Sequence, residues 1–140
     1  MSTIQVLSWV VFVVLAATVA FGVTNAVRWA RHATGSFPLG LILTHGVVQC
    51  VAVTLWLVFA VEALVVLGWV SFVIATAGQV LGDGLMLRSH SSRRPGTPAG
   101  YRAAAASTLS FRRPISALHA ICGAVAWFSM LGICIAASVS

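Results

Sequence analysis

All eight arginines of this chain fall in two short stretches, and the long apolar runs beside them contain none. Lysine is absent, 60% of the residues are hydrophobic and only 7% are charged. A chain with so few charges cannot cover a water-exposed surface, so its apolar runs must face lipid. Because positive residues of bilayer proteins gather on the cytoplasmic side, we predict an integral membrane protein with both arginine-bearing stretches in the cytoplasm.

Four segments are long and apolar enough to cross a bilayer, whose hydrocarbon core takes about 20 helical residues. The run 38–87 carries two charges, Glu62 and Asp83, and as one helix it would be about 75 Å long. It must therefore fold back once, near Glu62, with Trp56 and Trp69 flanking the turn at the membrane–water interface. We predict an all-α, four-helix transmembrane bundle that forms a single integral membrane domain over residues 1–140, with spans at about 4–27, 38–61, 63–87 and 114–137.

The orientation in the membrane follows from the charges. The basic links 28–37 and 88–113 are predicted to be cytoplasmic, which leaves both termini outside. No positive residue precedes the first apolar run, so we expect an uncleaved span rather than a signal peptide. Within the longer link, residues 101–113 are a candidate for a short helix on the membrane surface. Arginine without lysine, beside abundant alanine, valine and glycine, is typical of a GC-rich bacterial genome, so we expect a multi-pass protein of the bacterial inner (plasma) membrane.

The two halves of the chain follow one pattern. Each has an apolar span, an arginine-bearing link, a proline and then a span with a histidine near its start, as in FPLGLILTHG and RRPISALHA. The halves would run in the same direction, which is the parallel type of repeat found in some transporters. Topology rules alone would also produce two similar hairpins, so the pattern leaves a duplication open.

Small residues mark where the predicted helices pack, because helices in lipid associate by close approach of their backbones. The third span carries a stripe of small residues at spacings of four, three and four, namely Ser71, Ala75, Gly78 and Gly82. We expect this stripe to contact another helix tightly.

Two histidines inside the predicted spans are the strongest candidate site residues. Counted from the preceding prolines, His45 lies about 10 Å into its span and His119 about 7–8 Å into the last span, so the two imidazoles have similar depth. They are candidate axial ligands of one b-type haem, with Gln49 as the hydrogen-bond acceptor for His45 and the link arginines as partners of the propionates. The alternative is that each histidine only hydrogen-bonds a neighbour inside the bundle.

Other chemistries find less support in the sequence. His119 and Cys122 share a helical face, but two ligands do not make a copper or zinc site, so we expect no metal beyond the haem hypothesis. Since the arginines sit at membrane boundaries, we expect no nucleic-acid partner. Glu62 and Asp83 lie near the ends of spans, which disfavours proton-coupled transport. The sequence has no phosphate-binding loop and no HExxH or Ser–His–Asp pattern, so we expect no catalytic activity of its own.

The sequence therefore favours a small non-catalytic protein of the lipid bilayer, acting as a subunit or partner of a larger membrane complex or as a homo-oligomer. An electron-transfer membrane protein that holds haem b between His45 and His119 is the alternative. A small transporter or channel is the second alternative.

Overall fold

The computed structural model describes residues 2–32, 37–93 and 100–139. The described residues form five α-helices: α1 (Thr3–His32), α2 (Leu39–Glu62), α3 (Val65–Arg93), α4 (Tyr101–Leu109) and α5 (Pro114–Ser138). All but α4 are long and apolar enough to cross a membrane. The predicted all-α fold with four long apolar helices is therefore confirmed.

Two of the long helices continue beyond the predicted spans. α1 ends at His32 and α3 at Arg93, whereas the apolar runs end near residues 27 and 87. The first glycine or proline after α1 is Gly35 and the first after α3 is Pro95, so nothing in the intervening sequence breaks either helix. Basic residues also favour a helical C-terminus, where they interact with the negative end of the helix dipole.

The chain reverses between α2 and α3 at Ala63 and Leu64, inside the region where the sequence predicts the turn. Ala63 adopts the left-handed conformation, with φ 55°, and its N–H donates to the Phe59 carbonyl at 2.8 Å. This bond gives a donor to one of the carbonyls at the end of α2 that have no hydrogen-bond partner within the helix.

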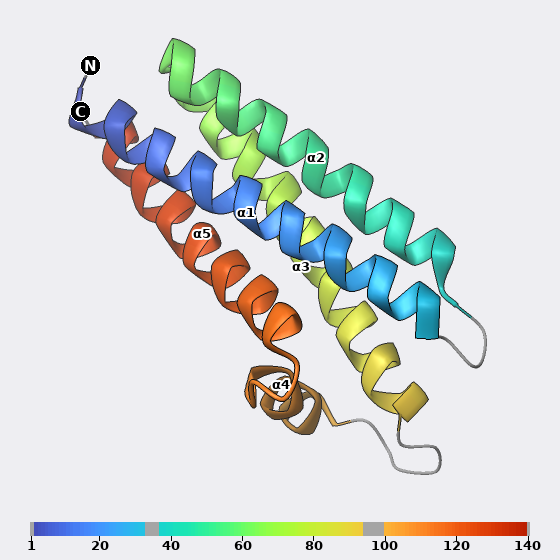
Figure 1. The fold of residues 1–140 in the computed structure, drawn as a ribbon. Helices are drawn as coiled ribbons and strands as arrows, with labels where there is room; N and C mark the ends of the chain where they lie inside the picture. The colour runs from blue at the N-terminus through green and yellow to red at the C-terminus, as the bar shows by residue number, and fades with distance from the viewer. Residues whose placement is uncertain (1, 33–36, 94–99, 140) are drawn as a thin grey trace.

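The four long helices form a bundle in which each helix packs on two others (Figure 1). α1 packs most extensively on α5, and α2 on α3, while α1 also contacts α2 and α3 contacts α5. α2 and α5 make no close backbone contact among the described residues, so they lie diagonally across the bundle.

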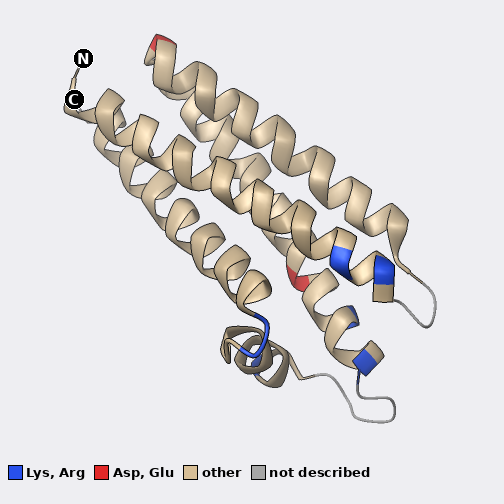
Figure 2. Cartoon of the chain, in the orientation of Figure 1, with Lys and Arg blue, Asp and Glu red and all other residues tan. Residues whose placement is uncertain are grey.

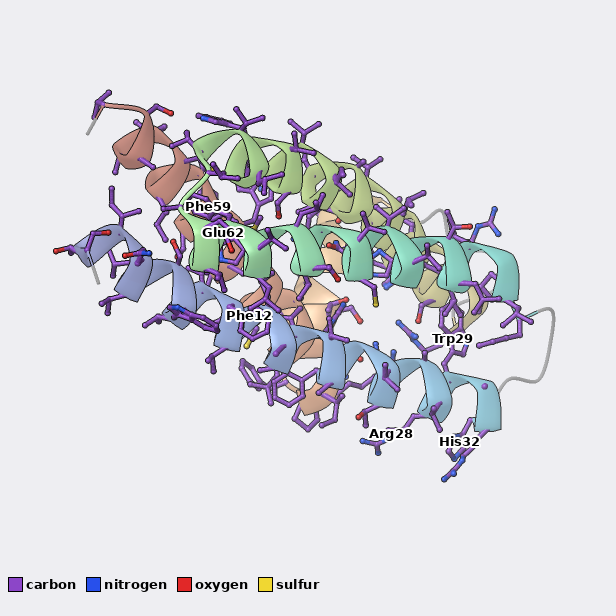
Figure 3. The ribbon with its side chains drawn as sticks, turned by 90° about the horizontal axis from the view of Figure 1, so that it is seen from above. Phe12, Arg28, Trp29, His32, Phe59 and Glu62 are labelled. Atoms are coloured by element: carbon purple, nitrogen blue, oxygen red, sulfur yellow. The ribbon has the colours of Figure 1, made fainter. Side chains whose placement is uncertain are left out.

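The arginines gather at the end of the bundle where α4 lies, as Figure 2 shows. We call this the arginine end, and we call the opposite end, which holds both termini and the turn between α2 and α3, the terminal end. Figure 3 shows Phe59 and Glu62 at the terminal end, far from Arg28, Trp29 and His32.

The tightest packing lies toward the terminal end. Trp56 is fully buried there, and its indole N–H donates to the Ser8 carbonyl at 3.0 Å. The expectation that Trp56 is an interfacial ring is therefore wrong, because its polar edge finds a partner inside the bundle. Trp69, in contrast, donates to the Ser138 hydroxyl at 3.0 Å near the chain end.

The half of the bundle near the arginine end contains fewer buried residues of α1 and α2. No residue of α1 beyond Leu15 is buried, and no residue of α2 before Ala52. In α3 no residue between Gly78 and His90 is buried, and in α5 the first buried residue after Ala117 is Gly123. The level of His45 and His119 therefore has fewer fully buried residues than the level of Trp56.

The small-residue stripe of α3 faces α2. Ser71 donates to the Ala52 carbonyl at 2.7 Å. A Cβ atom added to Gly78 would lie 2.6 Å from Nε2 of Gln49, and one added to Gly82 would lie 3.1 Å from Cε1 of His45. A larger side chain at either glycine would therefore push α2 away or displace these side chains.

We expect Gly78→Leu to destabilise the bundle by about 1–3 kcal/mol, the usual range for an overpacked interior. Thermal unfolding in detergent, followed by tryptophan fluorescence, measures the loss as a lower midpoint. Val73→Leu is the matched control, because Val73 is 63% exposed on the same helix. Equal midpoints for the two variants would contradict a tight contact along the stripe.

Candidate functional site

His45 and His119 face each other across the bundle from the two diagonal helices. Their ring centroids are 6.3 Å apart and their planes are inclined by 76°. The backbones of α2 and α5 do not approach closely, so the two imidazoles span the space between them. The two imidazoles, which the sequence predicts to lie at similar depth in the membrane, therefore face each other.

Each imidazole is anchored on the helix next to its own. Nδ1 of His45 lies 2.9 Å from the Gly78 carbonyl oxygen on α3, and Nδ1 of His119 lies 2.9 Å from the Thr18 carbonyl oxygen on α1. A carbonyl oxygen only accepts, so Nδ1 carries the hydrogen in both rings. In the neutral ring the lone pair is then on Nε2.

A glycine one turn beyond each carbonyl makes room for the ring. A Cβ atom added to Gly22 would lie 2.9 Å from Cε1 of His119, and one added to Gly82 would lie 3.1 Å from Cε1 of His45. The two anchors are therefore built alike, with a backbone acceptor followed four residues later by the glycine under the imidazole.

The likeness extends along α1 and α3, which match at a spacing of 60 residues (69 − 9 = 60). The segment Trp9-Val10-Val11-Phe12-Val13 corresponds to Trp69-Val70-Ser71-Phe72-Val73. Both Trp–Phe pairs are T-shaped with planes at 87°, and their centroids are 5.7 and 5.9 Å apart. The same spacing relates three further pairs: Thr18 to Gly78, Gly22 to Gly82, and Arg28 to Arg88. The similarity of the halves therefore includes the contacts that hold the histidines.

Both Nε2 atoms are free to meet a ligand. Among the described residues neither has a hydrogen-bond partner, and every buried side-chain nitrogen or oxygen there has one. Since both histidines are partly buried, their Nε2 atoms must be reachable by a water-sized probe. The open side of each ring is thus the side that carries the lone pair.

The separation of the rings suits one metal ion between them. A metal–imidazole bond is about 2 Å long and the nitrogen lies roughly 1 Å from the ring centre, so two imidazoles on opposite sides of an ion have centres about 6 Å apart. The observed 6.3 Å agrees with this value. Hydrogen bonds from the other ring nitrogen to a carbonyl are also what metal-bound histidines commonly make, because they fix the tautomer and the ring orientation.

Gln49 does not accept from His45, contrary to the sequence-based expectation. The ring uses the Gly78 carbonyl instead, and the Gln49 side chain lies against Gly78. The hydrogen-bonding position of Nδ1 is therefore already taken by a backbone carbonyl of the neighbouring helix. Gly46, next to His45, has open space where a Cβ would be, whereas Gly123 is close to Gln79.

The remaining polar residues do not extend this site into a larger ligand set. Among the described residues no three side chains of His, Cys, Asp or Glu come together to hold a metal ion. Asp83 accepts from the Tyr101 hydroxyl at 3.4 Å, and its charge is the main reason that the pKa of Tyr101 is raised. His32 is exposed and bonds the Arg28 carbonyl.

No family model, curated protein or solved structure matches the chain. A functional assignment therefore rests on the geometry of the two histidines.

Proposed function

We propose that the protein is a membrane electron-transfer protein that binds one b-type haem, with His45 and His119 as the two axial ligands. The observation that carries this proposal is the pair of imidazoles 6.3 Å apart, each with Nδ1 bonded to a backbone carbonyl and Nε2 free. The porphyrin supplies the other four iron ligands, so two histidines complete the coordination.

The packing supports the presence of a large group at this level. Helices in direct contact lie about 8–10 Å apart, which leaves no room for a porphyrin between them. His45 and His119 avoid that limit because their helices are diagonal and have no close backbone contact. The buried residues of α1 and α2 are confined to the half near the terminal end, so few fully packed side chains would have to move for a group to enter at the histidine level.

Arginines are suitably placed for the haem carboxylates. Arg28 and Arg88 each lie six residues beyond the glycine that supports a histidine, about 9 Å farther along the helix toward the arginine end. Guanidinium groups form paired hydrogen bonds with carboxylates. A haem whose propionates point to the arginine end would thus bring its charges to the membrane surface.

A bound haem would let the protein take up and release one electron at its iron. The chain's own part is to hold both imidazoles in a fixed orientation, through the bonds to the Thr18 and Gly78 carbonyls, and to surround the iron with apolar side chains. A carrier of single electrons needs a donor and an acceptor, which agrees with a role beside a membrane-protein partner in a larger complex.

The test of this function is the absorbance spectrum of protein purified from haem-supplemented cells. We expect a sharp Soret band and visible bands that sharpen on reduction with dithionite, at one haem per chain, because six-coordinate low-spin iron has this signature. A colourless protein that is folded and monodisperse would rule the proposal out and leave two structural histidines.

We further propose that the arginine end faces the cytoplasm of a bacterial inner membrane, with both termini outside. Single cysteines at Ser2 and Ser92, both exposed, report the orientation in a background in which Cys50, Cys122 and Cys134 are replaced. An impermeant thiol reagent applied to intact cells should label position 2 and spare position 92. Labelling of position 92 alone would show that the protein has the opposite orientation in the membrane.

A further inference from the structure

A second polar site lies at the arginine end, where α3 ends, α4 packs and α5 begins. It is an open cavity of about 170 Å³, and the described residues that line it are His90, Arg93, Ser107, Arg112 and Arg113. None of these residues belongs to the histidine pair described above. The cavity is therefore a separate site from the one proposed to bind haem.

His90 shows that the cavity is suited to a ligand. Its side chain is only 4% exposed, and among the described residues it has no hydrogen-bond partner. Because every buried side-chain nitrogen or oxygen there is satisfied, the ring nitrogens of His90 must open into the cavity that the residue lines. A buried imidazole with nothing to bond except the contents of a cavity is costly unless the cavity is filled.

The charge of the cavity identifies the kind of ligand. Three arginines line it, and none of the described acidic residues does. Of the two acidic residues of the chain, Glu62 lies at the terminal end and Asp83 bonds Tyr101. Arg93 donates to the Ser89 hydroxyl, whereas Arg112 and Arg113 have no hydrogen-bond partner among the described residues. Burial lowers the pKa of Arg113.

We infer that this cavity binds the phosphate group of an anionic ester. Guanidinium groups match phosphate oxygens with paired hydrogen bonds, and Ser107 and His90 add further donors. A water molecule occupies about 30 Å³, so a cavity several times larger accommodates a phosphate group.

Two sources could supply this phosphate, an anionic lipid headgroup or a soluble phosphate compound. The surroundings of the cavity place it at headgroup level, because the segment around α4 exposes apolar side chains beside the arginines. These are Tyr101, Leu109 and Phe111, exposed by 55%, 48% and 55%. Aromatic and basic residues mixed in this way are typical of the membrane–water interface.

The test is binding to the full chain in a neutral detergent, with a short-chain phosphatidylglycerol in one arm and inorganic phosphate in the other. Native mass spectrometry counts the bound lipid, and the unfolding midpoint follows the phosphate titration. R112Q/R113Q should weaken binding at least about tenfold, since it removes two charged donors. R31Q/R102Q is the matched control, because it loses the same charge at positions that are equally exposed but do not line the cavity.

Saturable binding of the lipid alone would identify a headgroup site, and saturable binding of inorganic phosphate would identify a soluble ligand. Should R112Q/R113Q fail to fold, R113Q and His90→Leu provide the same comparison with smaller changes. Equal weakening by R112Q/R113Q and R31Q/R102Q, or no saturable binding in either arm, would overturn the inference. None of these results depends on whether haem is bound.

Discussion

Replacing either His45 or His119 with alanine is expected to abolish the six-coordinate low-spin haem spectrum. Each imidazole supplies one of the two axial bonds, and no third His, Cys, Asp or Glu side chain joins them among the described residues. The spectrum of each purified variant should show either no Soret band or the broad band of five-coordinate iron. The two variants should be affected alike, because the two anchors are built alike.

The controls for this prediction are the other two histidines. His32→Ala and His90→Ala should keep the full spectrum, since His32 is exposed and His90 lines the separate basic cavity. Imidazole added to His45→Gly or His119→Gly should restore the low-spin bands, because a free ring can occupy the vacated space. An unchanged spectrum in either alanine variant would exclude that histidine as a ligand.

Gly22→Leu and Gly82→Leu are expected to reduce haem content about tenfold or more. Any side chain at these positions begins within about 3 Å of Cε1 of an imidazole, at 2.9 Å for Gly22 and 3.1 Å for Gly82. The ring must then rotate away from its carbonyl acceptor, and misplaced metal ligands bind far more weakly. Haem content per chain, measured by the pyridine haemochrome assay against protein concentration, gives the loss.

Gly40→Leu and Gly132→Leu are the matched controls, because a Cβ at either position meets nothing within 4 Å. These variants should keep haem at the wild-type level. Wild-type haem content in Gly22→Leu would contradict the location of the ligand rings against α1 and α3.

The sequence predicts the architecture well because composition decides it. A bilayer of fixed thickness and a run without charge allow only helices of given length, so the four long helices and the turn near Glu62 follow directly. The place of Trp56 does not follow, since an indole suits an interface and a buried site equally well. Its partner, the Ser8 carbonyl, lies 48 residues away, and a backbone acceptor has no signature in the sequence.

The same distinction applies to the candidate site. His45 and His119 could be selected from their depth, because the helical rise converts residue number into height. Their acceptors could not, since the carbonyls of Thr18 and Gly78 are indistinguishable from any other in sequence. Gly22 could have been found, because it matches Gly82 at the spacing that aligns Trp9 with Trp69. The basic cavity needed the structure, since α4 and α5 bring its residues together.

The most direct measurement of the central claim is electron paramagnetic resonance of the oxidised wild-type protein. Two imidazoles on one ferric haem give a low-spin signal, and ring planes inclined by 76° favour a strongly anisotropic form of it. We predict such a signal with an intensity of one iron per chain, lost in both His45→Ala and His119→Ala. A high-spin signal alone, or a folded protein without an iron signal, would contradict the assignment of these histidines as haem ligands.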